Sequence, residues 1–286
     1  MLNVIKMELY RLFRSKSLYI TAGVCAGVIA LLILLTAALM TALTEMVSPS
    51  DMTVSAGDAA AGIAVSAGGG EAAADPSLNP VSFCGSFISG FCKIMVAIFI
   101  AIFIHGFYKD GYDKNVIACV KNRWYFQAAK AACVAVYTAF LLVVSSVTAL
   151  VTSALTVDGF TFGYMGVFWE FLLGEFLLLN AIGLLSAFLT ELTRSKVTSI
   201  VYILLASTSL ISGLLSLLES RLSDLFHREI ELWKLLPSLY QSSFELDAAD
   251  TSGNGGMMLH AVVLSLVFMV IYNAAGAFLI TKRDVK

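Results

Sequence analysis

The sequence predicts an all-α integral membrane protein with six transmembrane helices, and three observations lead to that prediction. Hydrophobic residues make up 59% of the 286 positions and charged residues 13%, with a mean hydropathy of +0.87, so there is too little charge to cover a water-soluble globule of this size. Six apolar runs are each long enough to cross a bilayer core of ~30 Å as a helix. Fourteen of the 18 Lys and Arg residues lie on one side of these runs.

The six expected spans follow from the length of the runs and from the chemistry of lipid. Unpaired backbone cannot lie in hydrocarbon, and the runs lack the strict alternation of a barrel strand, so each is predicted to be helical. The expected spans cover residues 19–46, 82–108, 131–156, 164–189, 197–217 and 258–281. The first run follows a basic stretch, but it is far longer than the roughly 7 to 15 apolar residues of a signal peptide, which predicts a retained span.

The one-sided basic residues predict how the chain is oriented. By the positive-inside rule, the side that carries these residues faces the cytoplasm. The sequence therefore predicts a multi-pass protein of the cytoplasmic membrane with both termini in the cytoplasm. The first outer segment, residues 47–81, contains no Lys or Arg, and Lys93 lies within a span. The fourteen are Lys6, Arg11, Arg14, Lys16, Lys109, Lys114, Lys121, Arg123, Lys130, Arg194, Lys196, Lys282, Arg283 and Lys286.

Residues 1–17 are predicted to form an amphipathic helix on the cytoplasmic leaflet. A basic helix with an apolar arc lies in the plane of the membrane interface. A simple positive-inside anchor would explain the charges equally well, but not the apolar arc. At 100° per residue, the side chains that share the arc are Leu2, Ile5, Leu9, Leu12 and Phe13, and those that face away are Asn3, Lys6, Arg11 and Arg14.

The first outer segment, residues 47–81, is expected to be a mobile external loop. Its Ala/Gly/Ser-rich stretch, Thr53 to Ala74, has enough apolar residues for a weak lipid-facing helix, which is the alternative. Three consecutive glycines, Gly68 to Gly70, would break such a helix, and Asp58 and Glu71 would interrupt its apolar surface. A loop is therefore the preferred interpretation.

The second outer segment, residues 218–257, is predicted to contain an amphipathic helix. Between Leu214 and Tyr240, apolar residues recur at helical spacing with charged residues interleaved. Such a helix either lies in the outer interface or folds partly back into the membrane as a re-entrant segment. Pro237 is expected to end its main run. Function and plain packing both remain open for this segment.

A cytoplasmic helix is expected between the second and third spans. Val116, Ile117 and Val120 form a short apolar face that is flanked by basic and amide side chains. A loop that served only to set orientation would need the charges, but it would not need the apolar face. The pattern therefore favours a surface that packs on another protein.

The chain resembles the permease subunits of ABC transporters of the ABC-2 type, chiefly bacterial exporters. Three stretches carry the resemblance, and the six-span count and the helical insertion before the last span agree with it. The opening stretch, 6–16, is similar to the family's N-terminal elbow helix. Residues 108–115, followed by Arg123 and Lys130, are similar to the segment that includes the coupling helix, which docks on the ATPase. The ending, 276–284, resembles the family's sixth-span exit.

The resemblance implies a single transmembrane permease domain over residues 1–286. It implies export of a hydrophobic or amphipathic substrate, such as an antimicrobial peptide or a drug, across the cytoplasmic membrane. It assigns Lys6, Glu8, Arg11 and Arg14 to the elbow helix, and Asp110, Gly111, Lys114, Asn115 and Arg123 to the ATPase contact. The Ala/Gly-rich outer loop departs from the family in its length.

The partners that the resemblance implies are an ABC ATPase subunit, a second permease copy or a homologous permease, and the lipid bilayer, with no nucleic acid. The chain contains no G-x-x-x-x-G-K-[ST], so it cannot hold nucleotide phosphates in the P-loop manner. No cofactor is therefore expected on this chain, and ATP and Mg are expected in the partner ATPase.

Three ionisable residues lie inside the expected spans: Lys93, Glu170 and Glu175. A charge in hydrocarbon costs at least ~2.5 kcal/mol, so such residues indicate a cavity or a partner. Glu170 and Glu175 are about 140° apart around a helix, which argues against a paired-carboxylate catalytic site. Lys93 and Glu175 lie at similar depths, so we predict an ion pair between the second and fourth spans, with either a structural or a substrate-facing role.

Two other classes of protein are alternatives to an ATP-driven permease. An intramembrane enzyme is disfavoured because the sequence has no H-E-x-x-H, no G-x-S-x-G and no adjacent glutamates, so no catalytic residue is expected. Five cysteines without a C-x-x-C pair are read as apolar fillers rather than metal ligands. A secondary transporter driven by an ion gradient could use Lys93 and the two glutamates, but the sequence shows no inverted repeat with broken helices.

Overall fold

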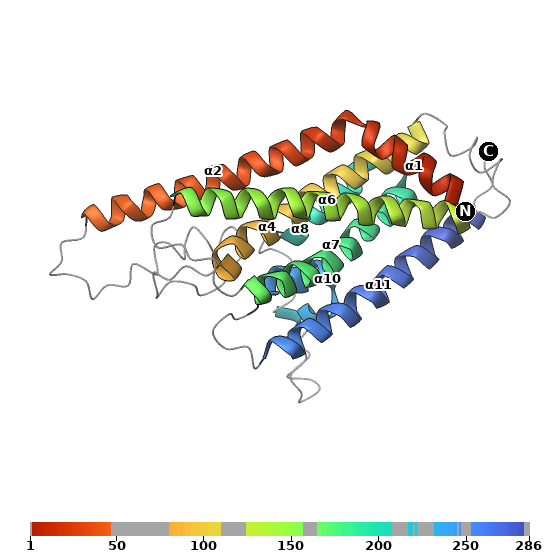
Figure 1. Ribbon diagram of the computed structural model, residues 1–286. Coiled ribbons are helices and arrows are strands. Elements are labelled where there is room, and N and C mark those ends of the chain that lie inside the picture. Colours follow the sequence, from red (N-terminus) through yellow and green to blue (C-terminus); the bar gives the residue numbers. More distant parts are fainter. Residues whose placement is uncertain are drawn as a thin grey trace.

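The computed structural model describes residues 2–46, 80–109, 124–156, 165–207, 217–219, 221, 232–244, 246 and 253–282. These residues are almost all helical, and none of them is in a strand (Figure 1). Within these described ranges, five helices are long and apolar enough to cross a membrane, which makes the chain a multi-pass membrane protein. They are α2 (Lys16–Met46), α4 (Pro80–Lys109), α6 (Trp124–Thr156), α7 (Met165–Thr193) and α11 (Asn254–Lys282).

The five long helices contain 29 to 33 residues each. At 1.5 Å per residue they are roughly 44 to 50 Å long, which exceeds the ~30 Å hydrocarbon core. They correspond to the expected spans 19–46, 82–108, 131–156, 164–189 and 258–281. The largest difference is at α6, which begins at Trp124 rather than residue 131. Its additional turns are helical because Phe126, Gln127 and Lys130 are buried against other helices.

The expected span 197–217 is matched over only part of its length. Helix α8 covers Lys196–Ser207, and its 12 residues would extend about 18 Å, which is too short to cross a bilayer alone. Residues 208–216 lie outside the described part of the chain. Helices α7 and α8 are joined by a tight turn in which Arg194 adopts a left-handed backbone conformation with φ of 54°.

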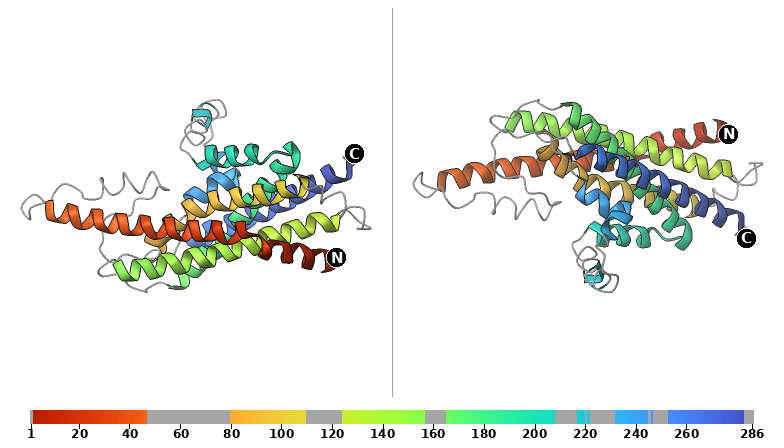
Figure 2. Two further views of the ribbon diagram at one scale, coloured as in Figure 1. Left: turned by 90° about the horizontal axis from the view of Figure 1, so that it is seen from above. Right: turned by 90° about the horizontal axis from the view of Figure 1, so that it is seen from below.

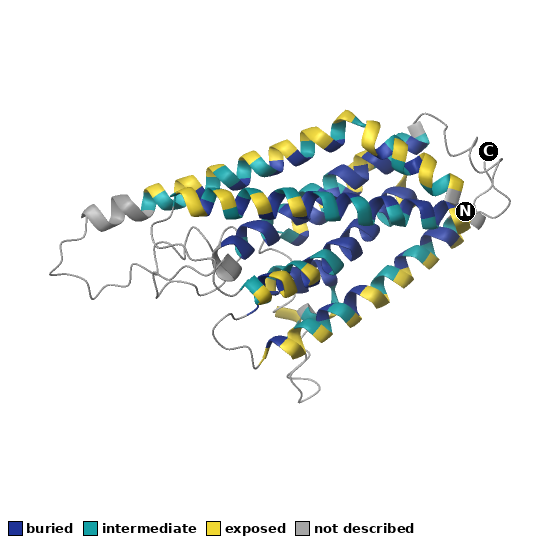
Figure 3. Ribbon diagram, in the orientation of Figure 1, coloured by how far each residue is buried: buried dark blue, intermediate teal, exposed yellow. Residues whose placement is uncertain are grey.

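Helices α4 and α7 form the centre of the bundle, whereas α2 and α11 lie at opposite edges (Figures 1 and 3). In the apolar windows of α2 and α11, 22% of the residues are buried, compared with 67% for α4 and 61% for α7. Close packing at the centre depends on Gly183. A Cβ at this position would lie 2.6 Å from Val134 Cγ1 and 3.2 Å from Val96 Cγ1, so only glycine lets α4, α6 and α7 approach this closely.

Both the first helix and the end of the last helix lie at one end of the bundle, which we call the terminal end (Figures 1 and 2). Helix α1 covers Leu2–Arg14 and is separated from α2 by Ser15, whose Oγ donates a hydrogen bond to the Leu12 carbonyl at 2.7 Å. The opposite end of the bundle is called the far end.

The face that α1 turns toward the bundle is not the apolar arc. Of the arc residues, Leu12 is buried, but Phe13 is 46% exposed. Glu8 is fully buried, and the Arg11 guanidinium lies 4.1 Å from the centre of the Phe107 ring on α4, although we predicted that Arg11 would face away from the apolar arc. The rings of α4 give this cation a favourable contact that a helical wheel cannot anticipate.

Three short helical turns precede α11: η1 (Leu232–Leu235), α10 (Pro237–Tyr240) and η2 (Gln241–Ser243). We call residues 232–244 the inserted segment. Pro237 begins α10 instead of ending a helix, because its fixed φ suits a first helical position and Leu236 before it is extended. Leu239, Tyr240, Gln241 and Phe244 are buried, so this segment folds into the bundle.

Some of the predicted elements cannot be compared with the structure. The expected outer loop 47–81 lies outside the described residues, except that Pro80 and Val81 begin α4. The expected cytoplasmic helix between the second and third spans also lies outside them, as does most of the segment between Leu214 and Glu231.

Candidate functional site

The first group of buried polar side chains surrounds Glu175 of α7, and we call it the Glu175 centre. Gln241 of the inserted segment donates a hydrogen bond from Nε2 to Glu175 Oε1, and the same nitrogen donates to the backbone carbonyl of Ser89 on α4 at 2.8 Å. Glu175 and Gln241 are both fully buried. Lys93 of α4 is 2% exposed, and its charge interacts electrostatically with that of Glu175.

The structure therefore places Lys93 and Glu175 in the same buried region. Within the described residues no direct ion pair joins them, however, and the hydrogen-bond partner of Glu175 is an amide from a third element. Glu170, the other glutamate considered in the sequence, is exposed and lies outside the centre. Gln241 was missed because nothing in its local sequence indicates a partner 66 residues away.

Aromatic packing holds the inserted segment against the Glu175 centre. The rings of Phe171 and Phe244 are stacked with centroids 5.8 Å apart. A Cβ at Gly174 would lie 2.7 Å from Phe244 Cε1 and 3.1 Å from Met258 Sδ, so the missing side chain at this position makes room for Phe244. Tyr240 donates a hydrogen bond to the Met257 carbonyl at 3.1 Å, which links the segment to α11.

The second group lies toward the terminal end, and we call it the Lys130 centre. Lys130 Nζ of α6 is 2.7 Å from Glu191 Oε1 of α7, and both side chains are 1% exposed. The ammonium also lies 4.5 Å from the centre of the Phe126 ring and 5.5 Å from that of Phe107. The charge pattern of the sequence predicts Lys130 to be a loop cation, and it gives no signal for Glu191, which follows the expected end of the fourth span at residue 189.

The Lys130 centre connects five helices. Phe107 of α4 contacts both Arg11 of α1 and Lys130 of α6, which in turn pairs with α7. Helix α11 approaches at Gly276, where a Cβ would collide with Gln127 Nε2 and come within 2.9 Å of Glu191 Oε2. Glycine at this position therefore allows α11 to approach the buried polar groups of α6 and α7.

The residues expected to contact an ATPase (Asp110, Gly111, Lys114, Asn115 and Arg123) lie outside the described residues. Their two flanks are described. Helix α4 ends at Lys109, three positions after Gly106, and α6 begins at Trp124. The Lys130 centre is thus built on the two helices that segment 110–123 connects.

Two of the expected elbow residues are on the surface of α1. Lys6 and Arg14 are exposed, and Arg14 donates a hydrogen bond from Nη1 to the Tyr10 hydroxyl at 3.1 Å. Glu8 and Arg11 instead face the bundle, where Glu8 is buried and the Arg11 guanidinium lies 5.5 Å from the centre of the Phe103 ring. The predicted elbow residues are therefore divided between two faces of the helix.

Four cysteines (Cys25, Cys84, Cys92 and Cys133) are free and buried, consistent with a role as small side chains between helices. Cys92 Sγ donates to Ser145 Oγ at 3.3 Å, and Cys84 Sγ lies 3.4 Å from Ser153 Oγ. In the described part of the chain, no group of three or more His, Cys, Asp or Glu side chains is placed to hold a metal ion.

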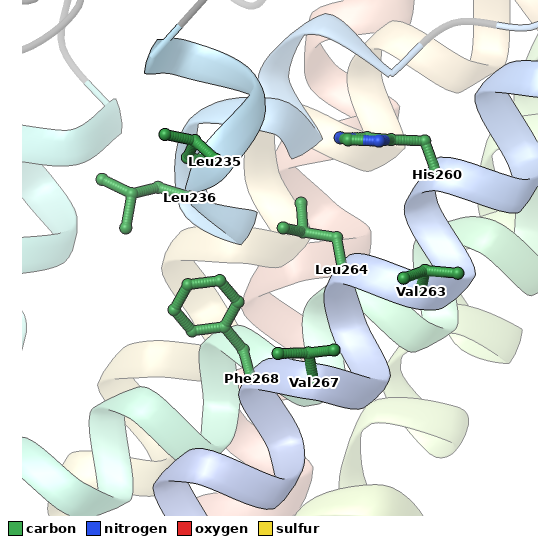
Figure 4. Close-up of a pocket in the computed structure, with 7 residues that line it drawn as sticks. All are labelled: Leu235, Leu236, His260, Val263, Leu264, Val267 and Phe268. Carbon is green, nitrogen blue, oxygen red and sulfur yellow. The ribbon is translucent and has the colours of Figure 1, made fainter.

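An apolar pocket of about 510 Å³ lies between η1 and α11 (Figure 4). One ring nitrogen of His260, Nε2, is 3.0 Å from the Lys234 carbonyl, and the His260 ring is 4.7 Å from that of Tyr240. The pocket therefore adjoins the inserted segment. It is lined by Leu235, Leu236, His260, Val263, Leu264, Val267 and Phe268.

The two centres differ in what they can do chemically. At the Lys130 centre, the cation and the carboxylate satisfy each other, which suits a mechanical connection between helices. At the Glu175 centre, a carboxylate and a carbonyl accept from one amide, which suits recognition of an N–H donor. No protein-family model matches the chain, and no curated protein matches it.

Proposed function

We propose that the chain is the membrane-spanning permease subunit of an ATP-binding cassette exporter of the ABC-2 type. It would move a hydrophobic or amphipathic substrate across the cytoplasmic membrane with energy from a separate ATPase subunit. The observation that carries the proposal is the Lys130 centre, because it connects five helices next to both ends of the segment expected to receive the ATPase.

The position of this centre suits the transmission of force. A partner that docks on residues 110–123 would act on the end of α4 and the start of α6. Phe107 and Lys130 lie on these helices within two turns of the segment, and Lys130 is paired with Glu191. Removing one partner of a buried ion pair costs about 3 to 5 kcal/mol, so α6 and α7 are expected to move together.

The outward face of α1 supports an elbow helix at the membrane surface. Met7, Tyr10 and Phe13 are exposed together with the basic side chains of Lys6 and Arg14. Apolar and basic residues on one helix surface are typical of binding in the interface of an anionic leaflet. With fourteen basic residues on the same side of the spans, both termini would lie in the cytoplasm.

The proposed partners are an ABC ATPase, a second permease subunit and the lipid bilayer. Two permease chains, identical or homologous, would sit above two ATPase subunits and export substrate by alternating access. ATP and Mg would be bound by the ATPase, and the present chain would supply the docking surface and the pathway.

The test is co-expression of the chain with a candidate ATPase subunit, followed by purification and measurement of ATP turnover in lipid nanodiscs. Lys114→Glu and Arg123→Glu are expected to reduce ATPase recovery or substrate-stimulated turnover by about tenfold. Lys196→Glu is the matched control, because this exposed lysine lies at the terminal end outside segment 110–123. Equal effects of all three variants, or export by the chain alone without ATP, would contradict the proposal.

A secondary transporter driven by an ion gradient is the second candidate, favoured by the burial of Lys93 and Glu175 in the middle of α4 and α7. Buried ionisable residues often mark proton or ion pathways. Proteoliposomes containing only this chain, energised by a pH gradient, separate the two candidates. Uptake that requires Glu175 but no ATPase would support the second candidate.

A further inference from the structure

One side-chain amide occupies two acceptors at the Glu175 centre. Gln241 Nε2 donates both to the Glu175 carboxylate of α7 and to the Ser89 carbonyl of α4. The amide does not come from the long helices that form the centre, but from the short inserted segment. The Glu175 carboxylate and the Ser89 carbonyl together accept from one N–H₂ group, and we call this pair of acceptors the fork. The amide that donates to the fork belongs to neither α4 nor α7.

The charges at the centre indicate which donor the fork prefers. Lys93 is buried in the same region as Glu175, so a cationic ligand at the fork would meet a lysine side chain as well as the carboxylate. An added ammonium would be attracted by the carboxylate but repelled by Lys93. A neutral N–H donor, such as the amide already present, avoids that repulsion.

Beyond the buried polar groups of the Glu175 centre, aromatic side chains border the fork. The Phe171 and Phe244 rings stack beside it, and Tyr240 lies against Phe244 with ring centroids 6.1 Å apart. Gly174 presents no side chain to this region. A ligand that reached the fork would therefore be apolar over most of its surface and polar at its N–H group.

We propose that the Glu175 carboxylate and the Ser89 carbonyl form the cargo-binding subsite of this chain, which Gln241 occupies as an internal substitute. The ligand class is a neutral amide on an otherwise apolar molecule, such as a hydrophobic peptide. This inference rests on the proposed transport function and names its substrate class.

The exchange between Gln241 and cargo costs little free energy, because one amide donor replaces another. Each state satisfies the same two acceptors with one N–H₂ group, so the net cost of buried hydrogen bonds is small in either direction. Without either donor, the buried carboxylate of Glu175 would lose its hydrogen bond, which costs free energy. A transport site needs two states of similar free energy, since it must both bind its ligand and release it.

The first test uses the full chain in lipid nanodiscs with Gln241→Ala, which removes the atoms of one acetamide molecule. We expect acetamide, at ten times its dissociation constant, to raise the Tm of this variant by roughly 3 °C and to leave the wild type unchanged. Methyl acetate, which has a similar shape but no N–H, should have no effect, and methylammonium should have a smaller one. Equal responses to acetamide and methyl acetate would overturn the inference.

The second test keeps Gln241 and measures equilibrium binding of radiolabelled dodecanamide to nanodiscs containing the chain. Glu175→Leu is expected to weaken binding at least tenfold, because a hydrogen bond to a charged acceptor is lost. Glu170→Leu is the matched control, since it changes an exposed glutamate on the same helix. Methyl dodecanoate should bind all three chains alike and so measures partition into lipid. Identical behaviour of the amide and the ester across the variants would refute the subsite.

Both tests use the chain without an ATPase. Failure to recover an ATPase partner would contradict the proposed function and leave the amide subsite standing. Loss of amide discrimination in a chain that still couples to an ATPase would contradict only the subsite.

Discussion

Lys130 and Glu191 place two full charges between α6 and α7, with Nζ and Oε1 2.7 Å apart and almost no exposure of either side chain. Lys93 and Glu175 are buried to the same degree, but the carboxylate accepts its hydrogen bond from Gln241. At the scale of single residues, the two pairs therefore predict different responses to mutation.

For the direct pair, we expect Glu191→Gln to lower the free energy of unfolding by about 3 kcal/mol or more, because the Lys130 charge loses its carboxylate. The double variant Lys130→Met with Glu191→Leu should recover much of this loss, since both charges are removed together. The measurement is unfolding in mixed micelles with increasing SDS. Glu170→Gln, at an exposed position, should change stability by less than about 0.5 kcal/mol. If the effects of Lys130→Met and Glu191→Leu, measured singly, add up to that of the double variant, the pair is not coupled.

For the Glu175 centre, we expect stronger coupling between Glu175 and Gln241 than between Glu175 and Lys93. A hydrogen bond to a charged acceptor contributes about 1.5 to 3 kcal/mol, whereas Lys93 acts on the carboxylate without direct contact. Two double-mutant cycles test this order, one with Glu175→Gln and Gln241→Leu and one with Glu175→Gln and Lys93→Met. A larger coupling energy in the cycle with Lys93 would contradict this order and would support the Lys93–Glu175 ion pair that the sequence predicts.

Whole helices approach one another through positions that lack a side chain. On α7, Gly183 faces α4 and α6, and Gly174 leaves room for Phe244. On α11, Gly276 faces Gln127 and Glu191. By contrast, a Cβ at Gly27 on α2 would meet nothing within 4 Å. The same substitution is therefore predicted to have opposite effects in different helices.

We expect Gly183→Ala to destabilise the bundle by about 1 to 3 kcal/mol, since the added methyl would overlap Val134 of α6. Gly27→Ala should be neutral or stabilising by up to about 1 kcal/mol, because alanine is the better helix former and has free space. Thermal unfolding of the two variants in the same nanodiscs measures the difference. A loss of stability in Gly27→Ala as large as in Gly183→Ala would argue against the packing at the centre.

The element boundaries show where local patterns were sufficient. The lengths of α4, α7 and α11 agree with their apolar runs because hydrocarbon thickness and backbone satisfaction act on each segment separately. Helix α6 begins seven residues before the expected span, because Lys130 and Gln127 resemble loop residues until Glu191 and Phe107 are brought beside them. Pro237 was read as a helix end, although the same fixed φ suits the first turn of α10.

At the scale of the molecule, α7 carries both centres. Glu175 and Glu191 are sixteen residues apart on this helix, which corresponds to about 24 Å. Under the proposed function, force enters near the terminal end through α4 and α6, passes to α7 through the Lys130 centre, and reaches the fork that Gln241 occupies.

This route predicts a charge-swap phenotype in the complex with an ATPase. Lys130→Glu and Glu191→Lys should each reduce substrate-stimulated ATP turnover by about tenfold or more, while the double exchange recovers part of it because opposite charges again face each other. The measurement compares stimulated with basal turnover, which separates coupling from ATPase integrity. Full stimulation in both folded single variants would exclude the Lys130 centre from the route.

The composition, the lengths of the apolar runs and the basic asymmetry determined that the chain is a helical membrane protein, because these properties act on each segment independently of the others. They could not determine which polar residues meet. Helices α4, α7 and α11 are apolar on nearly all sides, so their sequences do not indicate which face turns inward. Only the tertiary structure decided that Gln241 would reach Glu175 and that Lys130 would reach Glu191, since each contact joins residues more than sixty positions apart and depends on how the helices rotate and pack.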